Sequence, residues 1–220
     1  MKANRLMENA NYYVINLKRR PDRYHSFKSK YPLDQSSLNR VDAVDGRDLK
    51  TTPSHFKSLM PGEIGCFLSH KLLWEKAVHE NNKKYSVIFE DDAHFTDNFL
   101  DKYNEITNSF KHFDILYIGG RFKKNFRMTN CLKVTDTVVK YDYNKNWNSN
   151  DCDRTTHAYI LSQNFSQLLL DEYNKNESKS LELPPVDFFI INVLRYYKID
   201  IYSAHPLLCH SERNSESDIR

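Results

Sequence analysis

The stretch from Tyr85 to Asp92, which reads Tyr-Ser-Val-Ile-Phe-Glu-Asp-Asp, decides the fold class of this chain. An apolar, β-branched run ends abruptly in three consecutive carboxylates, Glu90, Asp91 and Asp92. Such a run is typical of a strand that is buried on both faces of an α/β sheet. Ligands of open α/β sheets bind at the carboxyl ends of the strands. The sequence therefore predicts an acidic cluster at the ligand-binding edge of a sheet.

These three acids repel one another, and burying any of them alone is costly. A divalent cation removes the repulsion, and hard carboxylate oxygens suit Mg²⁺ or Mn²⁺. A cation held there neutralises a diphosphate, so the first hypothesis is an enzyme that acts on a nucleotide-linked substrate. The competing interpretation is an exposed acidic turn after a strand, since short acidic runs are common in loops.

Composition narrows the classes of protein that fit. The 220 residues suffice for one domain with a full core, and the net charge of +3 is too small to indicate nucleic-acid binding. No apolar run approaches the ~20 residues that span a bilayer, and the polar N-terminus lacks a signal-peptide core. The four cysteines form no CxxC pair, which argues against a zinc site or a disulfide framework. We therefore expect a cytoplasmic protein without a membrane span. The absence of GxGxxG and Walker motifs disfavours Rossmann and P-loop sites.

The remaining segments alternate between strands and helices. Pro21 at a first helical position predicts one helix, and Thr96 and Ser162 as N-terminal caps predict two more. Helices are also predicted over residues 61–80 and 186–197. We expect residues 47–60 to form a loop and 122–154 to form an irregular insertion over the site, with a strand near 137–141. This alternation predicts a single α/β domain over 1–220 with a mostly parallel central sheet. The strands are expected at 12–17, 40–44, 85–89, 114–118, 157–161 and 199–203.

Several motifs, in order along nearly the whole chain, resemble glycosyltransferase family 25, which contains lipopolysaccharide sugar transferases and procollagen galactosyltransferases. The longest and most specific is Gly-Glu-Ile-Gly-Cys-Phe-Leu-Ser-His at 62–70. The resemblance implies a GT-A fold, a UDP-sugar donor with galactose favoured, Mn²⁺ with Mg²⁺ as the alternative, and inversion at the transferred sugar. The other matching segments are 14–17 with Arg19, Arg20 and Arg23, then 44–46, 90–92, 114–119, 158–162, 185–187 and 217–219.

The resemblance also assigns candidate metal ligands. Asp92 is the first, with Asp91 or Glu90 contributing to the metal or to the donor ribose. Because strand side chains alternate faces, Glu90 and Asp92 share a face while Asp91 points away. His210 corresponds to a C-terminal histidine of the collagen-modifying relatives, and imidazole is an acceptable Mn²⁺ ligand. A surface histidine in a tail is the alternative.

Asp187 has two candidate roles. It follows Pro184-Pro185 at the start of a helix, where a carboxylate acts as a structural cap. The family context adds the role of a general base that deprotonates the acceptor hydroxyl. Asp151 and Asp153 are weaker candidates for the same role.

The donor itself has several candidate contacts. One or more of Arg19, Arg20 and Arg23 pair with the diphosphate, with Arg121 as a parallel candidate, because guanidinium groups match phosphate oxygens. Asn16 and Asp45 are candidates for the uracil or ribose. Ser69 and His70 lie on a helix, where Cys66 and His70 share a face, and they contact the donor or support its pocket.

The resulting hypothesis is a metal-dependent glycosyltransferase that moves a sugar, with galactose as the best guess, from a UDP-sugar to an acceptor hydroxyl. The acceptor stays open among lipopolysaccharide, hydroxylysine-containing proteins and other glycans, and so does the oligomeric state. Two alternatives remain. One is a non-catalytic nucleotide- or glycan-binding module on the same fold, and the other is a metal-dependent phosphoester hydrolase.

Overall fold

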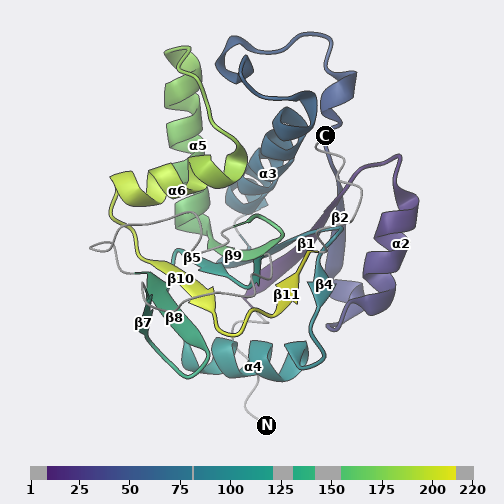
Figure 1. Cartoon of the computed structure of the whole chain (residues 1–220), viewed down its shortest axis with the longest axis vertical. Helices are drawn as coiled ribbons and strands as arrows, with labels where there is room; N and C mark the ends of the chain where they lie inside the picture. The colour runs from purple at the N-terminus through teal and green to yellow at the C-terminus, as the bar shows by residue number, and fades with distance from the viewer. Residues whose placement is uncertain (1–8, 81, 121–130, 142–154, 212–220) are drawn as a thin grey trace.

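The computed structural model describes residues 9–80, 82–120, 131–141 and 155–211, which form three layers with a central sheet between two sets of helices (Figure 1). Helices α3, α5 and α6 cover one face of the sheet, and α2 and α4 cover the other. The helices are α2 (Pro21–Lys30), α3 (Pro61–Glu80), α4 (Phe99–Ser109), α5 (Gln163–Ser178) and α6 (Val186–Tyr196).

The central sheet has eight strands in the order β2-β1-β3-β9-β5-β10-β8-β7. Their pairings show that β2, β1, β3, β5, β10 and β7 run in one direction, whereas β9 and β8 run in the other. The α/β class and the mostly parallel sheet are therefore confirmed, with β9 inserted antiparallel between β3 and β5. The strands are β1 (Ala10–Asn16), β2 (Leu38–Asp42), β3 (Tyr85–Glu90), β5 (Ile115–Tyr117), β7 (Cys131–Lys133), β8 (Val138–Tyr141), β9 (Ala158–Ser162) and β10 (Ile201–Ala204).

Strand β3 is buried on both faces, as its apolar run predicts. Val87 and Phe89 pack with α2 and α4, whereas Ile88 packs with α3, α5 and α6. Residues Tyr85–Phe89 of β3 are buried, and burial decreases at Glu90, where the acidic cluster begins. Burial of the strand thus fixes the position of the three acids.

A second, small sheet lies beside this end of β3. Its strands are β4 (His94–Phe95), β11 (Cys209–His210) and β6 (Gly119–Gly120), in that order. It brings the C-terminal part of the described chain next to the residues that follow the acidic cluster. A Cβ at Gly119 would lie 2.8 Å from the Ala158 Cβ, so glycine is needed for this close packing.

Two local predictions about helix caps have different outcomes. Ser162 caps α5 as expected, because its hydroxyl accepts a hydrogen bond from the Phe165 amide at 3.1 Å. The predicted Thr96 cap is wrong, since α4 begins at Phe99 with Asn98 at the cap position. The Thr96 hydroxyl instead donates to the Leu208 carbonyl at 3.0 Å, which ties the start of α4 to the C-terminal segment.

Two predictions about irregular segments need correction. Residues 131–141 form the antiparallel hairpin β7–β8 at the sheet edge, so this part of the expected insertion belongs to the sheet. The expected loop over 47–60 contains one short 3₁₀ helix and part of another. The 3₁₀ helices are η1 (Gln35–Ser37), η2 (Gly46–Asp48) and η3 (Ser54–Phe56). Among the described residues, none of the helices is both long and apolar enough to cross a bilayer.

Candidate active site

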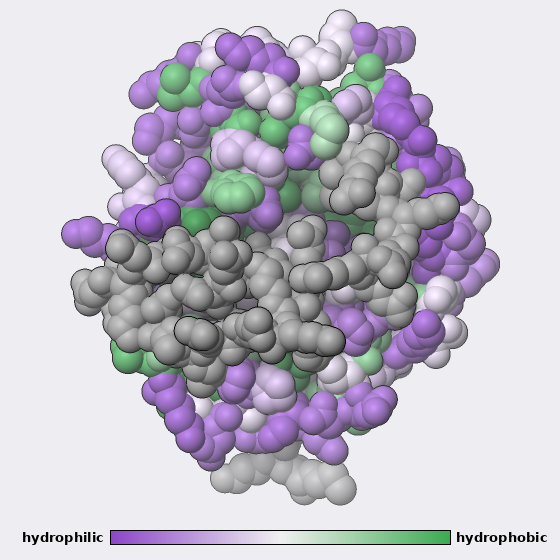
Figure 2. All heavy atoms as spheres, viewed as in Figure 1, coloured by the Kyte–Doolittle hydropathy of each residue, from purple (hydrophilic) through white to green (hydrophobic). Residues whose placement is uncertain are grey.

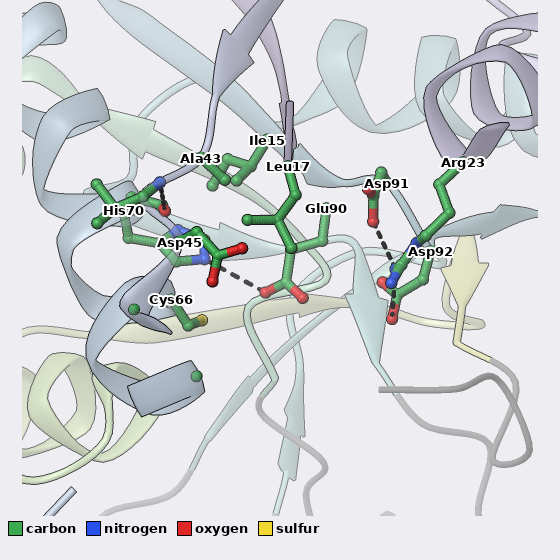
Figure 3. Close-up of a pocket in the computed structure, with 14 residues that line it drawn as sticks. Ile15, Leu17, Arg23, Ala43, Asp45, Cys66, His70, Glu90, Asp91 and Asp92 are labelled. Carbon is green, nitrogen blue, oxygen red and sulfur yellow. Dashed lines mark hydrogen bonds and ion pairs between the residues drawn. The ribbon is translucent and has the colours of Figure 1, made fainter. Parts of the chain in front are cut away.

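The carboxyl ends of β1, β2 and β3 meet at one edge of the sheet and line a cavity of about 90 Å³. Figure 3 shows this cavity, with Glu90 between the side chains of α3 and the group formed by Arg23, Asp91 and Asp92. The first turns of α3 form the opposite wall. The lining residues are Ile15, Leu17, Arg23, Ala43, Val44, Asp45, Gly46, Gly62, Cys66, Ser69, His70, Glu90, Asp91 and Asp92.

A second cavity of about 230 Å³ shares Arg23, Asp91 and Asp92 with the first. Arg20 and Lys30, from the start and the end of α2, add positive charge to its wall. The two cavities therefore meet at the acidic cluster and its arginine. Among the described residues coloured in Figure 2, hydrophilic side chains predominate, and hydrophobic ones lie among them where α3, α5 and α6 lie.

Two glycines allow the loop after β2 to pack directly on α3. A Cβ at Gly46 would lie 1.6 Å from the Pro61 carbonyl oxygen, and a Cβ at Gly65 would lie 2.5 Å from that of Val44. Ser69 completes the contact, because its hydroxyl accepts from the Val44 amide at 2.9 Å and donates to the Gly65 carbonyl at 2.6 Å. Ser69 is almost fully buried and thus holds this loop at the cavity wall.

Asp45, carried by that loop, is paired with two arginines. Its carboxylate caps η2 through the Arg47 amide, and it accepts hydrogen bonds from Arg47 Nε at 3.1 Å and Arg19 Nε at 2.6 Å. The hydrogen bonds from Arg47 and Arg19 outweigh the effect of burial and hold the pKa of Asp45 well below its usual range. Asp45 and Arg19, predicted as separate donor contacts, are therefore one ion pair beside the cavity.

Asp91 is held in place by two side chains from the β1–α2 segment. Asn16 Nδ2 donates to Asp91 Oδ2 at 2.6 Å, and Arg23 lies 2.5 Å from Asp91 Oδ1. Asn16 is fully buried and positions Asp91, and the donor contact predicted for it stays a prediction. Arg23 also lies 3.5 Å from Asp92 Oδ2, so it bridges the two acids (Figure 3).

The Glu90 side chain points toward α3, and it is held by residues of α3 and of the segment that leads into β9. The Thr156 hydroxyl donates to Glu90 Oε1 at 2.5 Å, and His70 Nε2 lies 3.3 Å from the same oxygen. The other ring nitrogen of His70 is hydrogen-bonded to the Tyr159 hydroxyl at 2.8 Å. Because His70 is fully buried and both nitrogens are used, it supports Glu90.

The electrostatics of the three acids are uneven. Burial raises the pKa of Asp91 to about 6, although Arg23 and Asn16 act in the opposite direction. Burial and the neighbouring Glu90 charge also raise the pKa of Asp92. For Glu90, burial is outweighed by His157, His70 and Thr156, and its pKa is lowered to about 2. The protein's own cations therefore do not fully compensate the negative charge at Asp91 and Asp92.

A cation fits the residues that are present. Asp92 Oδ1 is buried and has no hydrogen-bond partner among the described residues, as expected for an oxygen reserved for a metal. Ligand atoms of Glu90, Asp92 and His157 lie within 4.8 Å of one another, and a second such group consists of Cys66, His70 and Glu90. Glu90 and Asp92 thus lie close together, although β3 ends at Glu90 and Asp92 lies in a turn, so strand alternation does not account for it.

His157 is the residue of this group that the sequence analysis missed. It directly precedes β9, which runs antiparallel to β3. The start of an antiparallel strand lies at the same edge as the ends of its parallel neighbours, so a residue before β9 reaches the acidic cluster that follows β3. The pattern Thr-Thr-His before a buried strand is the signal that could have found it.

The remaining predicted residues are placed differently. Asp187 lies in the first turn of α6, whose cap position is Pro185, and its Oδ1 accepts from the Phe188 amide at 2.9 Å. Burial, and then the charges of Glu90, Asp187 and Asp92, raise the pKa of the Cys66 thiol. His210 pairs with His94 in the small sheet, with ring centroids 5.9 Å apart. Outside the described residues lie Arg121, Asp151, Asp153 and 217–219.

Comparisons with known proteins identify relatives of this chain. The chain is 28% identical over 212 residues to procollagen galactosyltransferase 1-A of Xenopus laevis, covering 88% of this chain and 32% of that protein. It is 33% identical over 213 residues to the probable inactive glycosyltransferase 25 family member 3 of Rattus norvegicus, covering 88% of this chain and 34% of that protein. The chain thus spans about a third of the length of these relatives.

The fold is also found among solved structures. A glycosyltransferase involved in the glycosylation of the major capsid of PBCV-1 superposes with a TM-score of 0.50 at 7% identity, covering 94% of each chain. This likeness shows the GT-A-like fold predicted from the sequence. Residues 9–190 match the sequence profile described as glycosyltransferase family 25 (LPS biosynthesis protein), and the chain therefore belongs to this family.

Proposed function

We propose that this glycosyltransferase uses a divalent cation, Mn²⁺ or Mg²⁺, to bind a UDP-sugar and transfers the sugar to an acceptor hydroxyl with inversion. The observation that carries the proposal is the pair Glu90 and Asp92 at the cavity wall, with Asp92 Oδ1 buried and lacking a hydrogen-bond partner among the described residues. When bound, the cation acts as a Lewis acid that stabilises the leaving nucleoside diphosphate.

Different residues are proposed to contact different parts of the donor. The apolar side chains of Ile15, Leu17 and Ala43 suit the face of a nucleobase, and Asp45 at the same wall suits its polar edge. Arg23 lies where the two cavities meet, at a suitable place for the diphosphate. We propose that Arg19 contributes to donor binding by fixing Asp45.

Asp187 is the proposed general base. Its charge acts on Cys66 together with those of Glu90 and Asp92, so it belongs to the same electrostatic environment as the metal ligands. Its hydrogen bond from the Phe188 amide stabilises the carboxylate and lowers its basicity, which makes the proton transfer depend on a well-placed acceptor hydroxyl.

The relatives support a proposal for the transferred sugar and the acceptor. One relative is a procollagen galactosyltransferase, and the family description names lipopolysaccharide biosynthesis. We therefore propose galactose as the sugar, and a glycan or a hydroxylysine-containing protein as the acceptor. His210 stays a proposed additional metal ligand, since β11 runs beside β4, two residues after Asp92.

The proposal is tested by measuring UDP release from a panel of UDP-sugars with Mn²⁺, with and without EDTA. Asp92→Asn removes the charge and one ligand oxygen, and we expect at least a roughly 100-fold loss of release, as for other groups that stabilise a developing charge. Asp136→Asn is the matched control, because Asp136 is an exposed carboxylate paired with Lys133 at the edge hairpin.

The outcomes separate the candidate functions. Metal-dependent release that requires an added acceptor and that Asp92→Asn abolishes supports the proposal, whereas fast release without any acceptor would indicate a hydrolase. UDP binding without any release would indicate a binding module, a role that is relevant because one relative is described as probably inactive. If the wild-type protein neither binds nor releases UDP with any donor, the proposal is wrong.

A further inference from the structure

His157 is fixed next to the acidic cluster by the backbone. The Glu90 amide donates to the His157 carbonyl at 2.9 Å, immediately beyond the paired residues Phe89 and Ala158. A ladder hydrogen bond of a central sheet is one of the least mobile contacts in a fold. The distance between these two residues is therefore set by the sheet.

The imidazole of His157 is oriented toward Asp92. Its Nδ1 is hydrogen-bonded to the hydroxyl of Thr155, which is itself buried. Its Nε2 lies 3.9 Å from Asp92 Oδ2, and only 12% of the side chain is exposed. A histidine whose first nitrogen is hydrogen-bonded and whose second faces a carboxylate has the arrangement of a metal ligand with its orienting partner.

We propose that His157 Nε2, together with Glu90 and Asp92, binds the divalent cation and that this nitrogen makes the site prefer Mn²⁺ and Co²⁺ over Mg²⁺. The inference rests on the proposed metal-dependent function. Imidazole is a good ligand for transition metals, whereas Mg²⁺ is bound almost only through oxygen atoms. Three oxygen ligands would not give this preference.

The geometry agrees with a shared ion. Two opposite ligands at about 2.1 Å from an ion lie about 4.2 Å apart, and the Nε2–Oδ2 distance of 3.9 Å falls inside this limit. Asp92 Oδ1, the buried oxygen without a partner among the described residues, is a further ligand atom of the same group. Asp91 does not compete, because Asn16 and Arg23 use both of its oxygens.

The neighbouring group of Cys66, His70 and Glu90 is the competing position for the ion. In that group both ring nitrogens of His70 already have protein partners, Tyr159 and Glu90. The structure therefore favours His157, whose Nε2 faces Asp92 Oδ2 at 3.9 Å, too far for a hydrogen bond. The test below distinguishes these two histidines.

The experiment is pulsed electron paramagnetic resonance of Mn²⁺ added with UDP to the wild-type protein and its variants. We expect a nitrogen coupling in the wild type that changes with ¹⁵N-histidine labelling. The variants are compared in a His210→Gln background, because His210 is the other proposed histidine ligand, and in that background the coupling is lost in His157→Gln. His25→Gln, on the exposed face of α2, is the control that keeps the coupling. Titrations should show at least a roughly tenfold weaker Mn²⁺ affinity for His157→Gln, with a smaller change for Mg²⁺.

Each outcome of this experiment either supports or overturns the inference about His157. If Mn²⁺ binds the labelled wild-type protein without any histidine nitrogen coupling, the inference is wrong even if His157→Gln fails to fold. A coupling that persists in folded His157→Gln also overturns it, and its loss in His70→Gln alone would place the ion at the competing group. If Mn²⁺ does not bind the wild type at all, the proposed metal dependence fails as well.

Discussion

Substitution of Gly65 by alanine tests how the loop after β2 is held against α3. The added Cβ would lie 2.5 Å from the Val44 carbonyl oxygen and 2.7 Å from the Gly46 amide nitrogen. Both are backbone atoms, so the clash is not relieved by rotating a side chain. An ordinary contact of about 3.4 Å requires the loop or the helix to move by about 0.9 Å.

Two opposing terms set the size of the effect. Alanine is favoured over glycine inside a helix by about 1 kcal/mol, whereas overpacking costs about 1–3 kcal/mol. A 0.9 Å shift away from α3 would also lengthen the 2.9 Å hydrogen bond between the Val44 amide and Ser69, which adds about 1 kcal/mol. We therefore expect a net loss of about 1–3 kcal/mol in the free energy of unfolding.

Urea denaturation measures this loss, and calorimetry with UDP measures its consequence for binding. Because Asp45 and Ala43 move with the loop, we expect UDP to bind at least roughly tenfold more weakly. Ser69→Ala is the comparison, since it removes the hydrogen bond without the clash and should cost only about 1 kcal/mol. If Gly65→Ala is as stable as the wild type, the packing argument is refuted, and unchanged UDP affinity would refute the link to the cavity.

Three further predictions concern the acidic cluster and the helix cap. Asn16→Leu removes the hydrogen bond that Asn16 donates to Asp91. Because the acceptor is an ionisable carboxyl, we expect the free energy of unfolding to fall by about 1.5–3 kcal/mol in denaturation experiments. An unchanged denaturation midpoint would show that Asn16 does not hold Asp91. In metal-free protein, the pKa of Asp91 is about 6 when folded against 3.8 as the ordinary value, so the folded state keeps a proton that the unfolded state has lost. Stability should therefore fall as the pH rises from about 3.8 through about 6, by at most about 3 kcal/mol in all. Asp91→Asn should flatten this dependence in denaturation midpoints, and an increase of stability across the window would contradict the sign. Ser162→Ala removes the cap of α5 and should lower the free energy of unfolding by about 1 kcal/mol. Thr96→Val removes no helix cap and should leave the helix content measured by circular dichroism unchanged. Equal loss of helix in both variants would contradict the assignment of the caps.

The sequence by itself determined the features that depend on neighbouring residues. The apolar run before Glu90 identifies a buried strand, because its burial requires apolar side chains on both faces. Ser162 identifies the start of α5, since a cap needs only a hydroxyl three residues before the amide that it binds. The family motifs likewise follow one another along the chain, and together they predicted the fold and the acidic cluster.

Only the tertiary structure decided which distant residues support that cluster. Asn16 and Asp91 are 75 positions apart, and their hydrogen bond depends on the parallel pairing of β1 with β3. His157 reaches Asp92 because β9 is antiparallel, a direction that the apolar pattern of a strand does not specify. Gly46 and Gly65 read locally as turn and helix residues, yet their contact fixes the cavity wall. Strand direction, register and close packing are set by the free energy of the whole core, so a local pattern does not contain them.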